Sequence, residues 1–353
     1  MRAQSLLIGS AVILLCGSLA ASGQQPEIVH AKLDQASASA GLSAAITSVT
    51  RLESGPSWIG YAVPAVADGD GSGHPNHGWS SCNADLEEGS NYTHGSGAPD
   101  DLSNRRILIF LRTHQQRIEK VRMFEASCRV DADGMPVHWL AEVRPSDSVE
   151  LIRSYVRDDH GNDESHSKGA ALAAIASTDD PSADAAMQQF TSASSPADLR
   201  KDAVFWLGAA RGRKGYEVLR TIVKLDPSDE VRDRAIFALS ISPVPEAVDA
   251  LIDVARHDSN SHLPGQALFW LAHKAGAKAA GAISSATEDD PNTEVKKKAV
   301  FALTRLPPDQ GVPLLIKVAE SNRNPEVRKQ AFFWLGQSPD ARALDFIARV
   351  LTD

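Results

Sequence analysis

Oxygen ligands of the kind that bind calcium cluster in a segment rich in Gly, Ser and Asn at residues 67–103. Three side chains occupy the first ligand positions of a calcium-binding loop: Asp68, Asp70 and Ser72. Gly73 follows at the position of the turn, but such a loop needs a bidentate glutamate at its twelfth position, where this chain has Trp79. The pattern therefore favours a solvated loop, and no calcium ion is expected.

The same segment offers nitrogen and sulfur ligands for zinc. His74, His77 and Cys82 lie close together in the sequence HPNHGWSSC. A structural zinc site needs four ligands, and Cys82 is expected to form a disulfide bond with Cys128 instead of binding a metal. We expect no metal and no cofactor in this chain, and a solvated loop is again the favoured interpretation.

Catalytic motifs are missing from the sequence. It contains no His-Glu-x-x-His, no Gly-x-Ser-x-Gly and no Gly-rich phosphate-binding loop. The histidines are scattered, and a sequence alone does not show whether a Ser, a His and an Asp converge in space. The formal net charge of −9 repels the phosphates of a nucleic acid. A protein without catalytic activity is therefore expected, and nucleic acid is not expected as its partner.

The N-terminus has the order of a secretory signal, with a basic residue, an apolar run over residues 6–15 and the small residues GSLAASG. Cleavage near Ala20 or Gly23 would remove it, and no other stretch is long and apolar enough to span a membrane. A lipidated cysteine follows a small residue, whereas Cys16 follows Leu15, so a lipoprotein is not expected. The mature protein is predicted to be periplasmic or secreted.

Cys82 and Cys128 are the cysteines that remain after this cleavage. Exported proteins fold in an oxidising compartment, where a pair of cysteines usually forms a disulfide. We expect one Cys82–Cys128 bond in the N-terminal region. It would contribute about 3–4 kcal/mol by restricting the unfolded chain.

A repeat of 32 residues dominates the second half of the chain. Its first segment occurs five times without gaps: DLRKDAVFWLG from Asp198, EVRDRAIFALS from Glu230, HLPGQALFWLA from His262, EVKKKAVFALT from Glu294 and EVRKQAFFWLG from Glu326. A second apolar segment with helical spacing follows each of them. The unit is therefore two short helices, and neighbouring units must stack to bury their apolar faces. HSKGAALAAIA from His166 is a weaker, sixth match that we interpret as a capping repeat.

One column of the first helix carries phenylalanine in all five copies: Phe205, Phe237, Phe269, Phe301 and Phe333. An aromatic ring at helical spacing is usually part of a core, so each ring is expected to fill the groove between neighbouring first helices. The alternative is an exposed interaction ladder that binds a partner. The next column alternates large and small residues: Trp206, Ala238, Trp270, Ala302 and Trp334. This order favours core packing of the tryptophans.

These columns resemble the short HEAT-like repeats of the bilin-lyase type, in which the first helix is approximately V-R-x-x-A-A-x-A-L-G after an Asp-Pro turn. EVRKQAFFWLGQ and DPSDEVRDRAIFALS are the stretches that carry the resemblance. It covers residues 198–353 well and residues 166–197 loosely. The resemblance is specific for a fold and not for a function.

The resemblance also implies a ladder of charged side chains between repeats, built from an Asp in the turn and an Arg early in the first helix. Two pairs occupy the matching positions: Asp226 with Arg232, and Asp290 with Lys296. Asp258 is aligned with Pro264 instead of a cation. The ladder is therefore expected to be intermittent.

The region before the repeats has a sequence pattern that differs from that of the repeats. Strands are predicted at SWIGYAVP, RILIFLRT and RIEKVRMFEA, and two more strands in CRVDADGMPVHWL around a turn at Asp133 and Gly134. SDSVELIRSYV is predicted to be a helix with a Ser or Asp cap. A polar run from Arg157 marks the boundary to the repeats.

The predicted fold is mainly α, a right-handed α-solenoid of about six 32-residue helix-turn-helix repeats preceded by a small α+β domain. The predicted segments are a signal peptide at 1–23, an α+β domain at 24–157 with its Gly/Ser-rich loop at 67–103, a linker at 158–165, and a HEAT-like solenoid at 166–353. An extended solenoid surface suits a non-catalytic scaffold or binding protein whose partner is another protein of unknown identity.

The alternative function is a lyase-like or metal-dependent enzyme or ligand binder. Its site would lie in the N-terminal loop or at the domain junction. This alternative is based on the resemblance, because repeats of this type occur in lyases that attach bilins to phycobiliproteins. No organised acid–base or nucleophile cluster is visible on the repeats of this chain.

Overall fold

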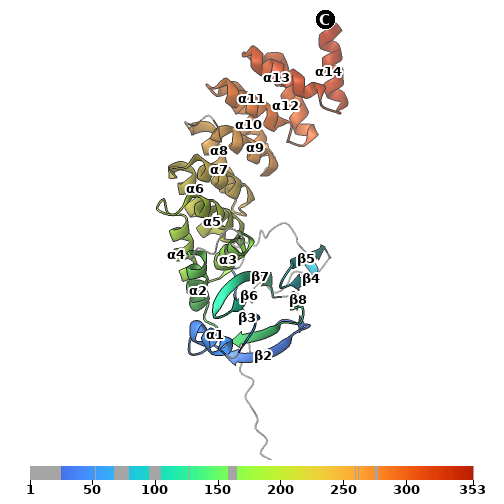
Figure 1. The fold of residues 1–353 in the computed structure, drawn as a ribbon. Coiled ribbons are helices and arrows are strands. Elements are labelled where there is room, and N and C mark those ends of the chain that lie inside the picture. Colours follow the sequence, from blue (N-terminus) through green and yellow to red (C-terminus); the bar gives the residue numbers. More distant parts are fainter. Residues whose placement is uncertain are drawn as a thin grey trace, which may run out of the picture.

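The computed structural model describes residues 25–51, 53–66, 79–94, 105–126, 128–157, 165–258, 260, 262–274 and 277–352. Within them, two β-sheets and two helices lie at one end of the molecule, and six helix pairs extend from that end as a curved array (Figure 1). The fold is mainly α, as predicted. No helix in the described part of the chain is long and apolar enough to cross a bilayer.

The larger sheet has five strands in the order β2-β9-β3-β6-β7. Its strands are β2 (Lys32–Ser37), β3 (Ser57–Pro64), β6 (Arg106–His114), β7 (Arg117–Glu125) and β9 (Pro136–Ala141). The strands β3, β6 and β7 are antiparallel, whereas β9 pairs in parallel with both β2 and β3. The strands predicted at SWIGYAVP, RILIFLRT and RIEKVRMFEA are confirmed.

A smaller sheet has the strand order β1-β8-β4-β5. Two predictions made from the sequence are wrong in this region. Its strands are β1 (Ile28–Val29), β4 (Trp79–Asp85), β5 (Gly89–His94) and β8 (Arg129–Asp131). The segment 67–103 is therefore not one loop, since β4 and β5 form an antiparallel hairpin within it. The turn at Asp133 and Gly134 exists with positive φ at both residues, but β8 and β9 do not form a hairpin. They diverge into different sheets because each has parallel partners elsewhere.

The central strands β3, β6 and β9 of the larger sheet are largely buried on both faces. Ile59, Tyr61 and Ile109 belong to the core beneath the helices, and Trp58 and Phe110 belong to a second core shared with the smaller sheet. The alternation follows from the period of two in a strand. It makes the N-terminal region a layered structure of helices, sheet and sheet.

The helices α1 (Leu42–Thr50), α2 (Pro145–Arg157) and α3 (Ser165–Ser177) connect this region to the repeats. Helix α2 confirms the predicted helix, but it begins at Pro145, so the Ser and Asp residues predicted to cap it lie inside its first turn. It contacts both β3 and α3, while α3 packs on β6 and β7. One hydrophobic core therefore runs from the larger sheet into the repeats without interruption. The predicted linker lies mostly outside the described residues, so the domain boundaries stay a prediction.

Six helix pairs follow, as the repeat analysis predicted. The pair α3 and α4 (Pro181–Phe190) is the capping repeat. The remaining helices are α5 (Ala197–Ala210), α6 (Gly212–Leu225), α7 (Asp229–Ile241), α8 (Ala247–His257), α9 (Leu263–Lys274), α10 (Ala277–Asp289), α11 (Thr293–Leu303), α12 (Pro308–Ser321), α13 (Pro325–Gly336) and α14 (Ala341–Thr352). The invariant Ala and Leu columns are fully buried or nearly so in all five copies.

The ladder between repeats exists, but its pairs differ from the predicted ones. Arg200 donates to both carboxylate oxygens of Asp226 at 3.0 Å, and Arg232 pairs with Asp258. Each Asp is thus bound by the cation of the preceding repeat and not by the cation that follows it. The next cation position is Pro264, so the ladder stops there and is intermittent, as expected.

Candidate interaction surface

The repeated phenylalanines lie on one face of the first helices α5, α7, α9, α11 and α13. Four of them are half-buried, and Phe333 is 54% exposed. The ring planes of Phe205 and Phe237 are nearly parallel, with centroids 6.1 Å apart, and Phe269 and Phe301 repeat this arrangement at the same distance. The rings therefore occupy the grooves between first helices and still reach the surface.

The tryptophans join these stacked pairs into a continuous band. Trp270 lies 4.7 Å from Phe237 and 5.0 Å from Phe269, measured between ring centroids. Trp334 lies 5.1 Å from Phe301 and 5.0 Å from Phe333. We call this band the aromatic strip; its members are Phe205, Trp206, Phe237, Phe269, Trp270, Phe301, Phe333 and Trp334.

The alternation of Trp and Ala explains how the strip forms. Ala238 and Ala302 are fully buried, which leaves room for a tryptophan of the next repeat to lie against the preceding phenylalanine. Trp206, Trp270 and Trp334 are only partly buried, although they pack against the core as predicted. The sequence analysis assigned the tryptophans to the core and missed that they also bridge the strip.

Cations lie over the rings of the strip. Arg234 is 5.0 Å from the ring centroid of Phe205 and 5.4 Å from that of Phe237. Arg305 lies 4.9 Å from the centroid of Phe301, and the imidazole of His273 packs 4.5 Å from that of Phe269. The cation–π contacts of Arg234 and Arg305 help to hold the rings in place. Aromatic and arginine side chains together are the residues most enriched among the energetic centres of protein interfaces.

Comparison with known proteins places the strip in a recognised type of repeat. A family model described as HEAT repeats matches residues 185–271 and 281–353. Both segments have the pattern of HEAT repeats. The matched residues contain all of α5–α8 and α11–α14 and the part of α9 up to residue 271, and hence all eight members of the strip. No curated protein matches the chain.

Several solved structures match the chain at low similarity. A chain from the complex of CpcE and CpcF of phycocyanin lyase from Nostoc sp. is 23% identical, with a TM-score of 0.30, over 47% of this chain and 96% of that chain. An engineered protein is 22% identical, with a TM-score of 0.29, over 57% of this chain and 58% of its own length. A chain from the structure of Kap95p with RanGDP is 17% identical, with a TM-score of 0.34, over 54% of this chain and 29% of that chain.

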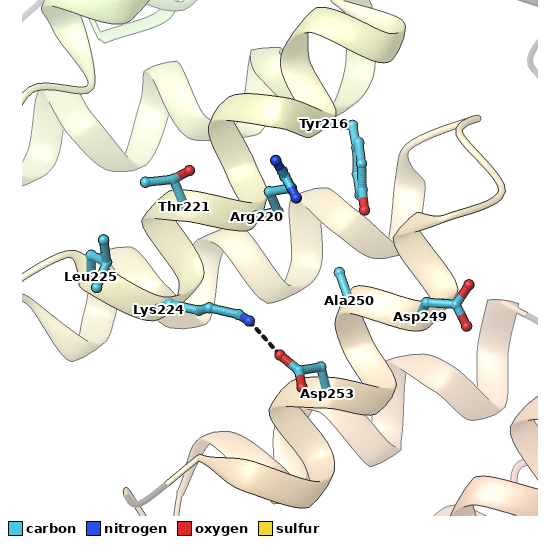
Figure 2. A pocket seen from close by; sticks show the side chains of 8 residues that line it. All are labelled: Tyr216, Arg220, Thr221, Lys224, Leu225, Asp249, Ala250 and Asp253. Atoms are coloured by element: carbon cyan, nitrogen blue, oxygen red, sulfur yellow. Dashed lines mark ion pairs between the residues drawn. The ribbon is translucent and has the colours of Figure 1, made fainter.

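The second helices of the repeats form a different surface. An open depression of about 420 Å³ lies between α6 and α8, and Figure 2 shows Tyr216, Arg220 and Lys224 on one side of it and Asp249 and Asp253 on the other. Its charges are already paired within the chain: Lys224 with Asp253, Arg220 with Glu217 and Asp249 with Lys278. These pairs leave little free charge to attract a ligand.

Two aspartates beside the strip have raised pKa values. Burial raises the pKa of Asp202 and of Asp233 above the usual range of an aspartate, against the opposing effect of Arg234. One carboxylate oxygen of Asp233 is buried and has no hydrogen-bond partner among the described residues. Sequence analysis missed both residues because a helix pattern does not show how neighbouring helices surround a carboxylate.

The other candidate residues lie in the N-terminal region. The metal candidates at residues 68–77 lie outside the described residues, where the structure tests neither calcium nor zinc. Within the described part of the chain, no three His, Cys, Asp or Glu side chains are grouped as metal ligands. Cys128 is almost fully buried, while the side chain of Cys82 is not described.

Proposed function

We propose that this chain is a non-catalytic scaffold whose repeat region binds another protein through the aromatic strip. The observation that carries the proposal is a continuous band of eight rings that is fixed by stacking and by Arg234 and Arg305, yet remains partly exposed. Fixed rings lose little conformational entropy on binding. A partner that covers them would gain apolar burial at about 25 cal/mol per Å².

The enzymatic alternative concerns residues that lie mainly in the segment 67–103. A lyase-like or metal-dependent activity would need several chemical groups to converge. In the described part of the repeats, the ionisable side chains form pairs and short networks between helices instead. The scaffold is therefore the function that the described residues support best.

The test of the scaffold uses a photocrosslinking amino acid at Phe333, the most exposed ring of the strip. In cells that express the full chain, we expect p-benzoylphenylalanine at this position to give discrete crosslinked products that contain a second polypeptide. The matched control places the same amino acid at Thr221, which is exposed on the second helix α6. Absence of products from Phe333, or equal products from both positions, would contradict the proposal.

Export and the disulfide are part of the same proposal. The parallel pairing of β4 with β8 aligns Asn83 with Arg129. Cys82 and Cys128 each precede one of these two residues in the sequence, which supports the proposed bond. Intact-mass spectrometry of the native protein under non-reducing conditions is expected to show loss of about the first 20–23 residues. The measured mass of the shortened chain should also be lower by two hydrogens than the mass calculated for its fully reduced form. A full-length or fully reduced mass would refute export or the disulfide, respectively.

A further inference from the structure

The charges that flank the aromatic strip change sign along the array. Side chains three or four residues from each phenylalanine share its helix face. On α5 and α7, this face and the preceding turn carry four carboxylates and two cations: Asp198, Asp202, Glu230, Asp233, Lys201 and Arg234. On α11 and α13, the same positions and the second residue after α11 carry four cations and two carboxylates: Lys297, Lys298, Arg305, Lys329, Glu294 and Glu326. The central helix α9 has no Asp, Glu, Lys or Arg at these positions.

The aromatic pattern is symmetric about the same central helix. The column beside the phenylalanines has Trp on α5, α9 and α13 and Ala on α7 and α11, so it has the same order in both directions. A two-fold axis through α9 would place α5 of one chain against α13 of another, and α7 against α11. The acidic positions of one chain would then face the basic positions of the other, and each tryptophan would face a tryptophan of the other chain. This is the self-complementarity that an isologous interface requires.

Several of these charged groups form no direct ion pair within one chain. Asp202 and Asp233 form no ion pair with any residue that the structure describes, and neither do Lys298, Arg305 and Lys329. One oxygen of Asp233 is buried without a hydrogen bond among described residues. A buried polar oxygen without a partner costs free energy, so a cation that reaches it from outside would stabilise the chain.

We infer that the protein bound by the aromatic strip is a second copy of this chain, docked antiparallel about a two-fold axis through α9. The inference rests on the proposed function, because it requires the strip to be a protein-binding surface. In this arrangement, Lys298 on α11 of one copy faces the surface of α7 that carries Asp233 in the other copy. Lys329 on α13 faces the surface of α5 that carries Asp202. The phenylalanines and tryptophans of both copies form the apolar centre.

The experiment is charge reversal in the full chain, measured by sedimentation equilibrium. The unaltered chain is expected to have twice the monomer mass. An acidic variant, Lys298→Glu with Lys329→Glu, and a basic variant, Asp202→Lys with Asp233→Lys, should each dissociate at least about tenfold more readily, because like charges then face each other. An equimolar mixture of the two variants should form a heterodimer. Circular dichroism confirms that each variant is folded.

A matched control has the same change in net charge on the second helices. Lys224→Glu with Arg349→Glu should leave the dimer intact. Failure of the mixed variants to associate, or equal dissociation of the control, would overturn the antiparallel dimer. A monomeric chain whose Phe333 crosslinks to a different protein would overturn this inference and leave the scaffold standing. A monomeric chain without any crosslink from Phe333 would overturn both.

Discussion

Replacing Arg200 with alanine is expected to lower the free energy of unfolding by about 3–5 kcal/mol, because it leaves the carboxylate of Asp226 buried without its cation. The side chains of Arg200 and Asp226 are only 7% and 3% exposed. Arg200 also donates to the carbonyl of Ser195 at 2.6 Å, so one side chain ties the capping repeat to the repeats that follow. Denaturant unfolding followed by circular dichroism measures the loss.

The control for this prediction is Lys201→Ala on the same helix. Lys201 pairs with Glu230 at the surface, where an ion pair contributes about 0–1 kcal/mol. The double variant Arg200→Ala with Asp226→Ala should lose less than the sum of the two single variants, because neither charge is then left alone. A loss below 1 kcal/mol for Arg200→Ala, equal to that for Lys201→Ala, would show that the ladder does not hold the repeats together.

Replacing Gly208 with alanine is expected to destabilise the array by about 1–3 kcal/mol, since the added methyl group overpacks the contact between α5 and α7. A Cβ atom at Gly208 would lie 2.8 Å from the carbonyl carbon of Ala238, which is a backbone atom of the next repeat. The helix cannot move away without separating the stacked rings of Phe205 and Phe237. Thermal unfolding compared with the unaltered chain measures the effect.

Gly281 in α10 provides the opposite control. A Cβ atom there meets nothing within 4 Å. Gly281→Ala should therefore stabilise the protein by about 0.5–1 kcal/mol, because alanine has the higher helix propensity and restricts the unfolded chain. If both substitutions change stability in the same direction, the close approach of α5 and α7 at Gly208 is not what limits packing.

The repeats were predictable because their information is local and periodic. A 32-residue period with invariant Ala and Leu columns defines two amphipathic helices, and the buried surface of each pair requires a neighbour. The structure confirms six pairs, with the capping repeat among them. The charged ladder was predicted in kind, but its partners were wrong, since a sequence alignment does not show which repeat an arginine such as Arg200 reaches.

The N-terminal region was less predictable because its strands pair over long distances. The turn at Asp133 and Gly134 has the chemistry of a hairpin, yet β8 and β9 belong to different sheets because their parallel partners come from far upstream. The hairpin of β4 and β5 lies in a segment so rich in Gly, Ser and Asn that its composition predicted a loop. Its strand β4 also pairs with β8 far along the chain, so in both cases long-range pairing overrode the local pattern.

The sequence by itself determined the helical repeat, its length, and the position of one phenylalanine in each of the five first helices that follow the capping repeat. Only the tertiary structure decided what those rings do. Exposure depends on the angle and distance between neighbouring repeats, and these depend on packing contacts such as that of Gly208 against Ala238 and on the ion pair of Arg200 with Asp226. The rings therefore became neither a closed core nor a free ladder, but a half-buried strip, because stacking between repeats covers one side of each ring and leaves the other at the surface.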